Sequence, residues 1–258
     1  MQPETNADYS EFFSNETLTK ELYDRAMDAA HTSYRAREAF DTKLNAAPTA
    51  TPTDHLRKGL GYLALSKYSD ALAHLEKAAD DGLKFYAAAE ALTALGRYDK
   101  ARTALAAAAE KGWDPLVCDM WTAELFVREN DLDAARKLVK KNEGRGADRG
   151  EWYYAQALIA EAELDRQTAC DMFEKALKLS ADLPRVMFRA AYLYDLVGDE
   201  DKAIELYKQL TARPRTHVNA LINMAVIHED RGDYERAAHC LRRVLKGFPN
   251  HRRARQFL

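Results

Sequence analysis

The sequence has 258 residues with a formal net charge of −3, and 47% of its residues are hydrophobic. This composition is ordinary for a folded protein, and the near-neutral balance excludes a strong overall attraction to nucleic acid or to a membrane. The cysteines Cys118, Cys170 and Cys240 are odd in number and form no C-x-x-C pair, which argues against a disulfide framework and a zinc site. A reducing compartment fits this pattern. The first residues lack the basic and apolar regions of a secretory signal, so we expect a cytoplasmic location.

Charge is distributed unevenly between the two ends of the chain. Residues 1–55 contain five Lys and Arg against ten Asp and Glu, whereas residues 211–258 contain ten Lys and Arg against four Asp and Glu. The sequence therefore predicts an acidic front and a basic back.

The first 53 residues divide into three segments. Residues 1–16 are polar with few spacing cues, so we expect a flexible N-terminus. Apolar residues then recur near the helical period, which predicts one long N-terminal helix over 17–45. Residues 46–53 include Pro48 and Pro52, and two prolines in five residues break any helix, so this segment is a predicted linker.

Small residues recur at a fixed interval through residues 54–250. They form two columns, and in each column the first two residues are 30 positions apart and every later pair is 34 positions apart. The columns are Ala71, Ala101, Ala135, Ala169, Ala203 and Ala237, and Gly59, Ala89, Ala123, Ala157, Ala191 and Ala225. A 34-residue period is typical of stacked helix–turn–helix units. We therefore predict an all-α fold, an α-solenoid of about six helix pairs following an N-terminal helical extension.

Each repeat follows one physical logic. A small residue in the middle of each helix lets two backbones approach closely. The turns between the helices are rich in Gly and Asp, because Gly suits a left-handed position after a helix and Asp suits the N-cap of the next helix. Asn142 interrupts a column of small or apolar residues, and the loop 142–150 holds three glycines. This loop is predicted to be the most flexible internal segment.

The repeats resemble the tetratricopeptide repeat family over residues 53–250. Repeat six carries Leu221, Ala225, Gly232, Tyr234, Ala237 and Pro249 at the family's positions, and repeat one carries Gly59, Tyr62, Tyr68, Ala71 and Ala78. The resemblance implies a right-handed superhelix that acts as a non-catalytic scaffold and binds a protein or peptide. Residues 219–258 are also similar to the end of the repeat array in some bacterial proteins that carry an RNA polymerase alpha C-terminal-like domain, which implies a transcription-linked module as the alternative.

The first helices of the pairs are expected to line the inner surface. Their side chains next to the small-residue column form a predicted groove of aromatic and aliphatic residues edged with carboxylates. The groove residues are Tyr86, Glu90, Met120, Glu124, Tyr154, Leu158, Glu161, Phe188, Tyr192, Asp195, Ile222 and Glu229. Such a groove favours a segment that is apolar with basic residues. The alternative for any one of these side chains is packing against the neighbouring repeat.

The chain ends in a basic helix start. Residues 251–258 read as the beginning of a further helix, which is either a cap or part of a truncated unit, and which could support self-association. The basic end consists of Arg242, Arg243, Arg252, Arg253 and Arg255. These arginines either contact an acidic partner or form a solvated helix face. Aromatic residues are not interleaved with them, so the sequence does not favour direct nucleic-acid binding.

No catalytic constellation is present in the sequence. It contains no H-E-x-x-H, no G-x-S-x-G and no phosphate-binding loop, so neither an enzyme, a cofactor nor a metal is predicted. An enzyme with its site on the solenoid is the third alternative. Some family members hold acidic peptide tails with Lys and Asn, but Glu90 and Glu124 stand at matching positions. Like-charge repulsion therefore disfavours an acidic tail as the ligand.

Overall fold

The computed structural model describes residues 9–179, 184–213, 215 and 217–257. Within these residues the chain forms seventeen helices and no strand. The helices are α1 (Ser10–Ser14), α2 (Lys20–Ala30), α3 (Tyr34–Ala46), α4 (Pro52–Ala64), α5 (Tyr68–Leu75), α6 (Gly82–Ala94), α7 (Tyr98–Glu110), α8 (Pro115–Arg128), α9 (Leu132–Lys141), α10 (Glu143–Gly146), α11 (Gly150–Ala162), α12 (Arg166–Leu179), α13 (Pro184–Leu196), α14 (Glu200–Thr211), α15 (Val218–Asp230), α16 (Tyr234–Gly247) and α17 (Arg252–Gln256).

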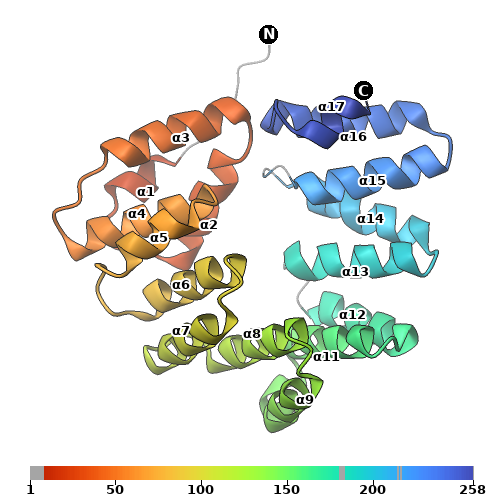
Figure 1. Cartoon of the computed structure of the whole chain (residues 1–258), viewed down its shortest axis with the longest axis horizontal. Coiled ribbons are helices and arrows are strands. Elements are labelled where there is room, and N and C mark those ends of the chain that lie inside the picture. Colours follow the sequence, from red (N-terminus) through yellow and green to blue (C-terminus); the bar gives the residue numbers. More distant parts are fainter. Residues whose placement is uncertain (1–8, 180–183, 214, 216, 258) are drawn as a thin grey trace.

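Six helix pairs pack in succession: α4–α5, α6–α7, α8–α9, α11–α12, α13–α14 and α15–α16 (Figure 1). Alanines of the predicted columns lie where the helices meet, and Ala71, Ala101, Ala157, Ala169 and Ala191 are completely buried. Because these side chains end at Cβ, adjacent backbones can approach closely. The predicted all-α solenoid of about six helix pairs with an N-terminal helical extension is confirmed.

The turns inside the pairs have the predicted local chemistry. Gly198 and Gly232 adopt positive φ angles of 84° and 74° at the ends of the first helices. Asp199 and Asp233 accept hydrogen bonds from backbone N–H groups in the first turns of α14 and α16. Leu164 occupies the same left-handed region with φ of 65°. Its Cβ strains this conformation, which glycine adopts freely.

The N-terminal extension contains two principal helices where the sequence predicted one over 17–45. Thr19 and Ser33 accept hydrogen bonds from backbone N–H groups at the starts of α2 and α3, so each helix has its own N-cap. His31 lies at the break, and its Nε2 is 2.6 Å from the Ala64 carbonyl oxygen at the end of α4. Burial lowers the pKa of His31 to about 4, so the ring is neutral and donates this hydrogen bond through Nε2. The hydrogen bond of His31 thereby links the extension to the first repeat.

The remaining N-terminal segments are also positioned by packing. Of the predicted flexible N-terminus, residues 1–8 lie outside the described residues, but α1 buries Phe12 against Phe40 of α3 with ring centres 5.7 Å apart. The predicted linker at 46–53 corresponds to the connection between α3 and α4. There Thr51 and Asp54 form a capping box, which fixes the start of α4.

The loop 142–150 is held in place, in contrast to its predicted flexibility. Asn142 is fully buried and donates hydrogen bonds from Nδ2 to the Asp119 carboxylate and to a carbonyl of α9, each at 2.9 Å. Gly146 in α10 packs so closely on Trp152 that an added Cβ would lie 2.3 Å from the ring. Glycine here permits close approach, although the sequence alone suggested freedom.

The C-terminal segment forms the short helix α17. His251 caps it by accepting a hydrogen bond from the Ala254 N–H at 3.2 Å. Ala254 is fully buried, whereas Phe257 is 54% exposed and Leu258 lies outside the described residues. The helix therefore covers the last repeat only in part.

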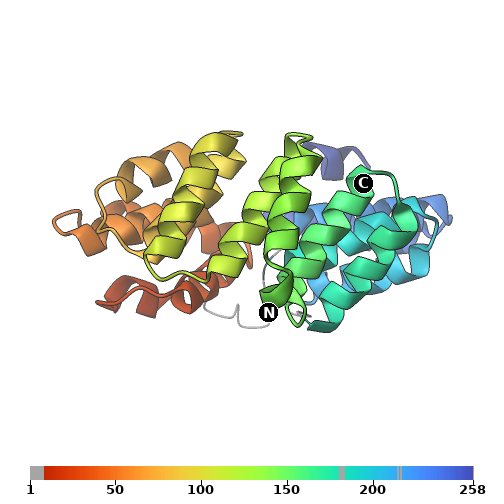
Figure 2. The same ribbon diagram turned by 90° about the horizontal axis from the view of Figure 1, so that it is seen from below.

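The solenoid curves until its two ends face each other across a central space (Figure 1). Figure 2 shows the same helices from below, standing side by side along the curve. Arg215 donates from Nη1 to the Met27 sulfur of α2 at 2.8 Å. The Arg37 guanidinium carbon of α3 lies 4.3 Å from the centre of the Phe248 ring. The N-terminal and C-terminal parts of the chain are thus in contact. No described helix is both long and apolar enough to cross a membrane.

Candidate binding cavity

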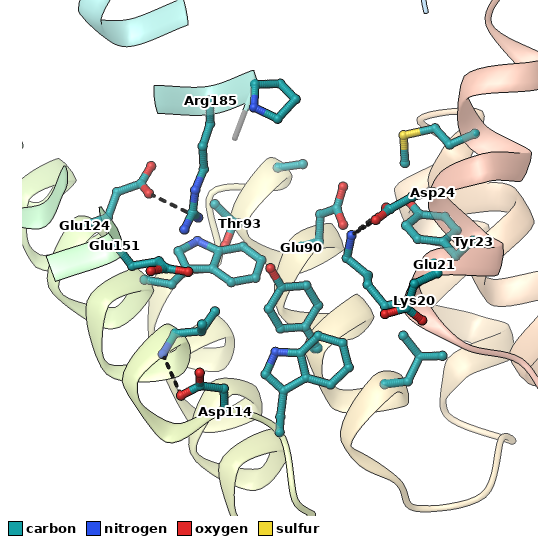
Figure 3. Close-up of a pocket in the computed structure, with 18 of the residues that line it drawn as sticks. Lys20, Glu21, Tyr23, Asp24, Glu90, Thr93, Asp114, Glu124, Glu151 and Arg185 are labelled. Atoms are coloured by element: carbon teal, nitrogen blue, oxygen red, sulfur yellow. Dashed lines mark hydrogen bonds and ion pairs between the residues drawn. The ribbon is translucent and has the colours of Figure 1, made fainter. Parts of the chain in front are cut away.

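A cavity of about 1330 Å³ lies in the centre of the curved solenoid. Its lining comes from α2 of the extension, from α6, α8 and α13 of the repeats, and from Arg213, Arg215 and His217 before α15. Figure 3 labels side chains of α2, α6, α8, α11 and α13 around the cavity, together with Asp114 just before α8. Helices α2 and α13 both line the cavity although they are more than 150 residues apart in the sequence. The cavity therefore depends on the curvature that brings the two ends of the solenoid together.

Three aromatic rings form one wall of the cavity. Tyr86 of α6 stacks on Trp113 with ring centres 4.3 Å apart and meets Trp121 of α8 edge-on at 5.0 Å. Burial raises the pKa of Tyr86 to about 12, so its phenol remains protonated at neutral pH. Rigid aromatic surface of this kind provides large contact area at low cost in conformational entropy.

Most charged side chains of the lining are paired. Glu124 of α8 accepts from Arg128 at 2.8 Å and lies 3.9 Å from Arg185 of α13. Lys20 pairs with Asp24 one turn further along α2 (Figure 3). These pairs balance positive and negative charge within the lining itself.

Two half-buried carboxylates of the cavity, Asp28 of α2 and Glu90 of α6, make no side-chain hydrogen bond or ion pair with the described residues. Of the two, Glu90 is the one that shares its helix with Tyr86. Burial raises its pKa above the ordinary value, an effect that the more distant charges of Lys20 and Arg215 oppose. The protein therefore holds a carboxyl group in a partly desolvated place with no partner of its own.

Four buried side-chain atoms of the described residues lack a hydrogen-bond partner, and all four belong to residues that line this cavity. They are Tyr23 Oη, Thr93 Oγ1, Glu151 Oε2 and His217 Nε2. Glu151 Oε2 still has an ion pair, 3.5 Å from Arg149 Nε. Because buried polar atoms nearly always have hydrogen-bond partners in folded proteins, the other three mark a cavity suited to a polar ligand. Burial lowers the pKa of His217 to about 4, and its ring is therefore neutral.

Three residues of the predicted groove line the cavity, namely Tyr86, Glu90 and Glu124. Four others lie in the core with 2–6% of their surface exposed. These are Met120, Tyr154, Leu158 and Ile222. For them the structure favours the alternative of packing against neighbouring repeats. Tyr154, for example, meets Phe173 of its own helix pair edge-on with ring centres 6.0 Å apart, and its ring centre lies 5.3 Å from the guanidinium carbon of Arg185 in the next pair.

The remaining groove residues lie along α11, α13 and α15, outside the cavity lining. Glu161 accepts a hydrogen bond from Arg189 at 3.0 Å, and burial raises its pKa. The same arginine lies 5.6 Å from the centre of the Tyr192 ring. Phe188 and Asp195 are half-buried, whereas Glu229 is exposed.

The basic end divides into exposed and packed arginines. Four are exposed: Arg242, Arg252, Arg253 and Arg255. Arg243 is half-buried and donates to the Thr211 carbonyl oxygen of α14. Arg243 therefore has a structural role, and the other four form a solvated surface away from the cavity.

Sequence reasoning missed a large part of the cavity lining. Tyr23 belongs to a helix that precedes the repeats, and Trp113 lies in the turn before α8. Arg185 reaches the cavity from α13, near the start of that helix. No repeat column contains these positions, so periodicity gave no signal for them. No group of His, Cys, Asp and Glu within the described residues could hold a metal ion.

Two family models, both described as tetratricopeptide repeat, match residues 56–115 and 197–258. The chain is also 32% identical over 83 residues to the photosystem I assembly protein Ycf3 of Prochlorococcus marinus (strain NATL2A), which is 31% of this chain and 48% of that protein. The Ycf3 of Synechococcus sp. (strain CC9605) gives the same identity and the same coverage. The chain thus spans about half the length of these curated relatives.

Solved structures resemble the fold over nearly the whole chain. A tetratricopeptide repeat protein from Parabacteroides merdae ATCC 43184 has a TM-score of 0.58 and 15% identity, covering 97% of both chains. A chain of the APC/C hetero-tetramer Cut9-Hcn1 also has a TM-score of 0.58, with 16% identity, covering 97% of this chain and 50% of that chain. At such identities the likeness concerns the fold alone. None of these findings supports the resemblance to proteins with an RNA polymerase alpha C-terminal-like domain.

Proposed function

The chain is a tetratricopeptide-repeat protein, and we propose that it is a non-catalytic adaptor that binds a segment of another protein in the central cavity. The observation that carries the proposal is that the aromatic wall and four buried polar atoms without a hydrogen-bond partner belong to one cavity. Buried aromatic residues are the usual anchors of protein interfaces. A buried polar atom without a hydrogen-bond partner adds to the specificity of binding when the ligand forms that hydrogen bond.

The size of the cavity favours a peptide over a small molecule. Its volume of about 1330 Å³ exceeds the roughly 300–1,000 Å³ of typical small-molecule pockets. A cavity bounded by helices from both ends of a solenoid can enclose several residues of an extended or helical segment. The repeats provide a rigid frame, and α2 of the N-terminal extension provides the opposite wall of the cavity.

The relatives support the same class of role. Ycf3 is by its name a photosystem I assembly protein, which is a role in building a protein complex. We extend only the general role of protein binding to this chain. The cytoplasmic location expected from the sequence stays a prediction.

Binding of defined peptides tests the proposal. Peptides of twelve residues are selected from a random library on the full chain, and their affinities are measured by fluorescence anisotropy. The substitution Tyr86→Leu keeps an apolar side chain on α6 but removes the ring that stacks on Trp113. We expect it to weaken binding at least tenfold, with unchanged helicity in circular dichroism.

The matched control is Tyr234→Leu, because Tyr234 is 70% exposed and lies outside the cavity. This variant should bind the same peptides as the unmodified chain does. If no peptide is selected, or if Tyr86→Leu binds normally, the cavity is not the binding site and the proposal fails.

A further inference from the structure

We propose that Glu90, together with the rings of Tyr86, Trp113 and Trp121, forms a subsite for one cationic side chain, Lys or Arg, of the bound segment. This inference rests on the proposed function and adds to it the chemistry of the ligand. The first argument is the unmet charge of Glu90, which pairs with no described residue although five basic side chains share the cavity. A carboxylate in a partly desolvated place is stabilised by an opposite charge brought close to it.

The basic side chains of the lining are engaged elsewhere. Lys20 is held by Asp24, and Arg185 is directed to Glu124, as Figure 3 shows. Arg215 contacts Met27 of α2. Since none of these three side chains pairs with Glu90, its carboxylate can pair with a cation of a bound ligand.

The aromatic wall is suited to the same ligand. Glu90 follows Tyr86 by four residues on α6, so both side chains project from one face of the helix. The ring of Tyr86 is stacked on Trp113 and edge-on to Trp121, which makes a continuous aromatic surface beside the carboxylate. An ammonium or guanidinium group is attracted to such ring faces, most strongly where water is excluded. An anion would be repelled by both features.

Tyr23 gives an independent indication of a polar ligand. Only 3% of its surface is exposed, and its Oη has no hydrogen-bond partner although the residue lines the cavity. Burial raises the pKa of Tyr23 well above its ordinary range, and the charge of Glu90 acts in the same direction. A lysine ammonium carries three N–H donors. It therefore has enough donors for both Glu90 and Tyr23 Oη.

Nuclear magnetic resonance of the full chain with a lysine analogue tests the subsite directly. The probe is N-acetyl-lysine N-methylamide, and the matched probe is the norleucine analogue, which has the same methylene chain without the charge. The indole N–H signals of Trp113 and Trp121 should shift in a saturable way with the lysine probe. The signal of Trp152 should remain, because its Nε1 donates to Val139 outside the cavity. We expect at least fivefold weaker binding of the norleucine probe.

Two variants separate charge recognition from structure. Glu90→Gln keeps the shape of the side chain and should weaken the lysine probe at least fivefold, whereas Glu229→Gln alters an exposed carboxylate outside the cavity and should change nothing. Equal binding of the lysine probe to Glu90→Gln and to the unmodified chain would overturn the subsite.

The selected peptides distinguish this inference from the proposed function. Peptides that need Tyr86 but bind equally well after Lys or Arg is replaced by norleucine would leave the cavity as the binding site and overturn the cationic subsite alone. Loss of peptide affinity on that replacement in the unmodified chain, with no further loss in Glu90→Gln, would support the subsite. Absence of any selected peptide, together with no response to the lysine probe, would overturn both.

Discussion

The repeats and the N-terminal extension are both built of paired helices, yet they are held in place by different means. In the repeats, completely buried alanines such as Ala169 and Ala191 bring backbones together at every contact. The extension instead meets the far end of the chain through Arg37 on Phe248 and Arg215 on Met27. The periodic part therefore supplies a rigid frame, whereas the aperiodic part closes the frame and completes the candidate site.

The largest expected effect concerns the periodic frame. Ala191→Arg places a long cation in a fully buried helix contact, and overpacking with charge burial costs several kcal/mol, about 3 or more. We expect loss of the cooperative thermal transition in circular dichroism. Ala73→Arg on the exposed face of α5 is the control and should melt as the unmodified chain does. A normal transition for Ala191→Arg would mean that the repeat register is wrong.

Acid should loosen the extension through the buried ring of His31. The folded pKa of His31 is depressed to about 4 from 6.5, so the unfolded form binds more protons between these values and stability falls as the pH falls below 6.5. At pH 5 this single group removes about 2 kcal/mol of stability relative to pH 7.5. Hydrogen exchange in α2 and α3 measures the effect.

The control for the acid effect is His31→Gln, whose side-chain amide can still donate to the Ala64 carbonyl oxygen but does not titrate. Exchange in α2 and α3 of this variant should depend much less on pH, apart from the contribution of His217. Equal pH dependence in both proteins would assign the acid effect to other groups.

The contacts that close the solenoid should be weak one by one. Arg37→Ala removes the cation over Phe248, an interaction of about 1 kcal/mol between two half-buried groups. We expect faster hydrogen exchange in α3 and an unchanged rate in α11, which lies in the middle of the repeats. Uniformly faster exchange along the chain would show that the extension and the repeats unfold as one unit.

The smallest expected effect is a gain of stability inside the repeats. Leu164 is 80% exposed at a φ of 65°, where glycine is preferred. Leu164→Gly relieves about 1–2 kcal/mol of backbone strain and costs about 0.5–1 kcal/mol of chain entropy. Urea denaturation should therefore show a net gain of about 0.5 kcal/mol. Gly198→Ala, at the matching turn of the next pair, should lose stability.

The repeats were predictable because each unit contacts only its neighbours. A 34-residue spacing of small residues specifies which helices meet, and the turn glycines specify where the pairs bend. Two local features were not predictable in this way. The break between α2 and α3 depends on Ser33 as an N-cap, and the order of the 142–150 loop depends on Trp152 packing on Gly146. Both depend on particular side-chain contacts that composition does not reveal.

The candidate site was predictable only on one wall. Tyr86, Glu90 and Glu124 follow from the inner face of the first helices, and all three line the cavity. Tyr23 and Arg185 were missed because they meet the others only after the solenoid has turned through several pairs. Small rotations between repeats accumulate along the chain, and a single sequence does not specify their sum.

The central claim is that the closed solenoid binds its partner between the extension and the repeats. Hydrogen exchange of the full chain with and without a selected twelve-residue peptide tests it most directly. The account predicts simultaneous protection of α2, α6 and α13, which line the cavity from both ends of the chain. Protection confined to α16 and α17, with α2 and α6 unchanged, would contradict it.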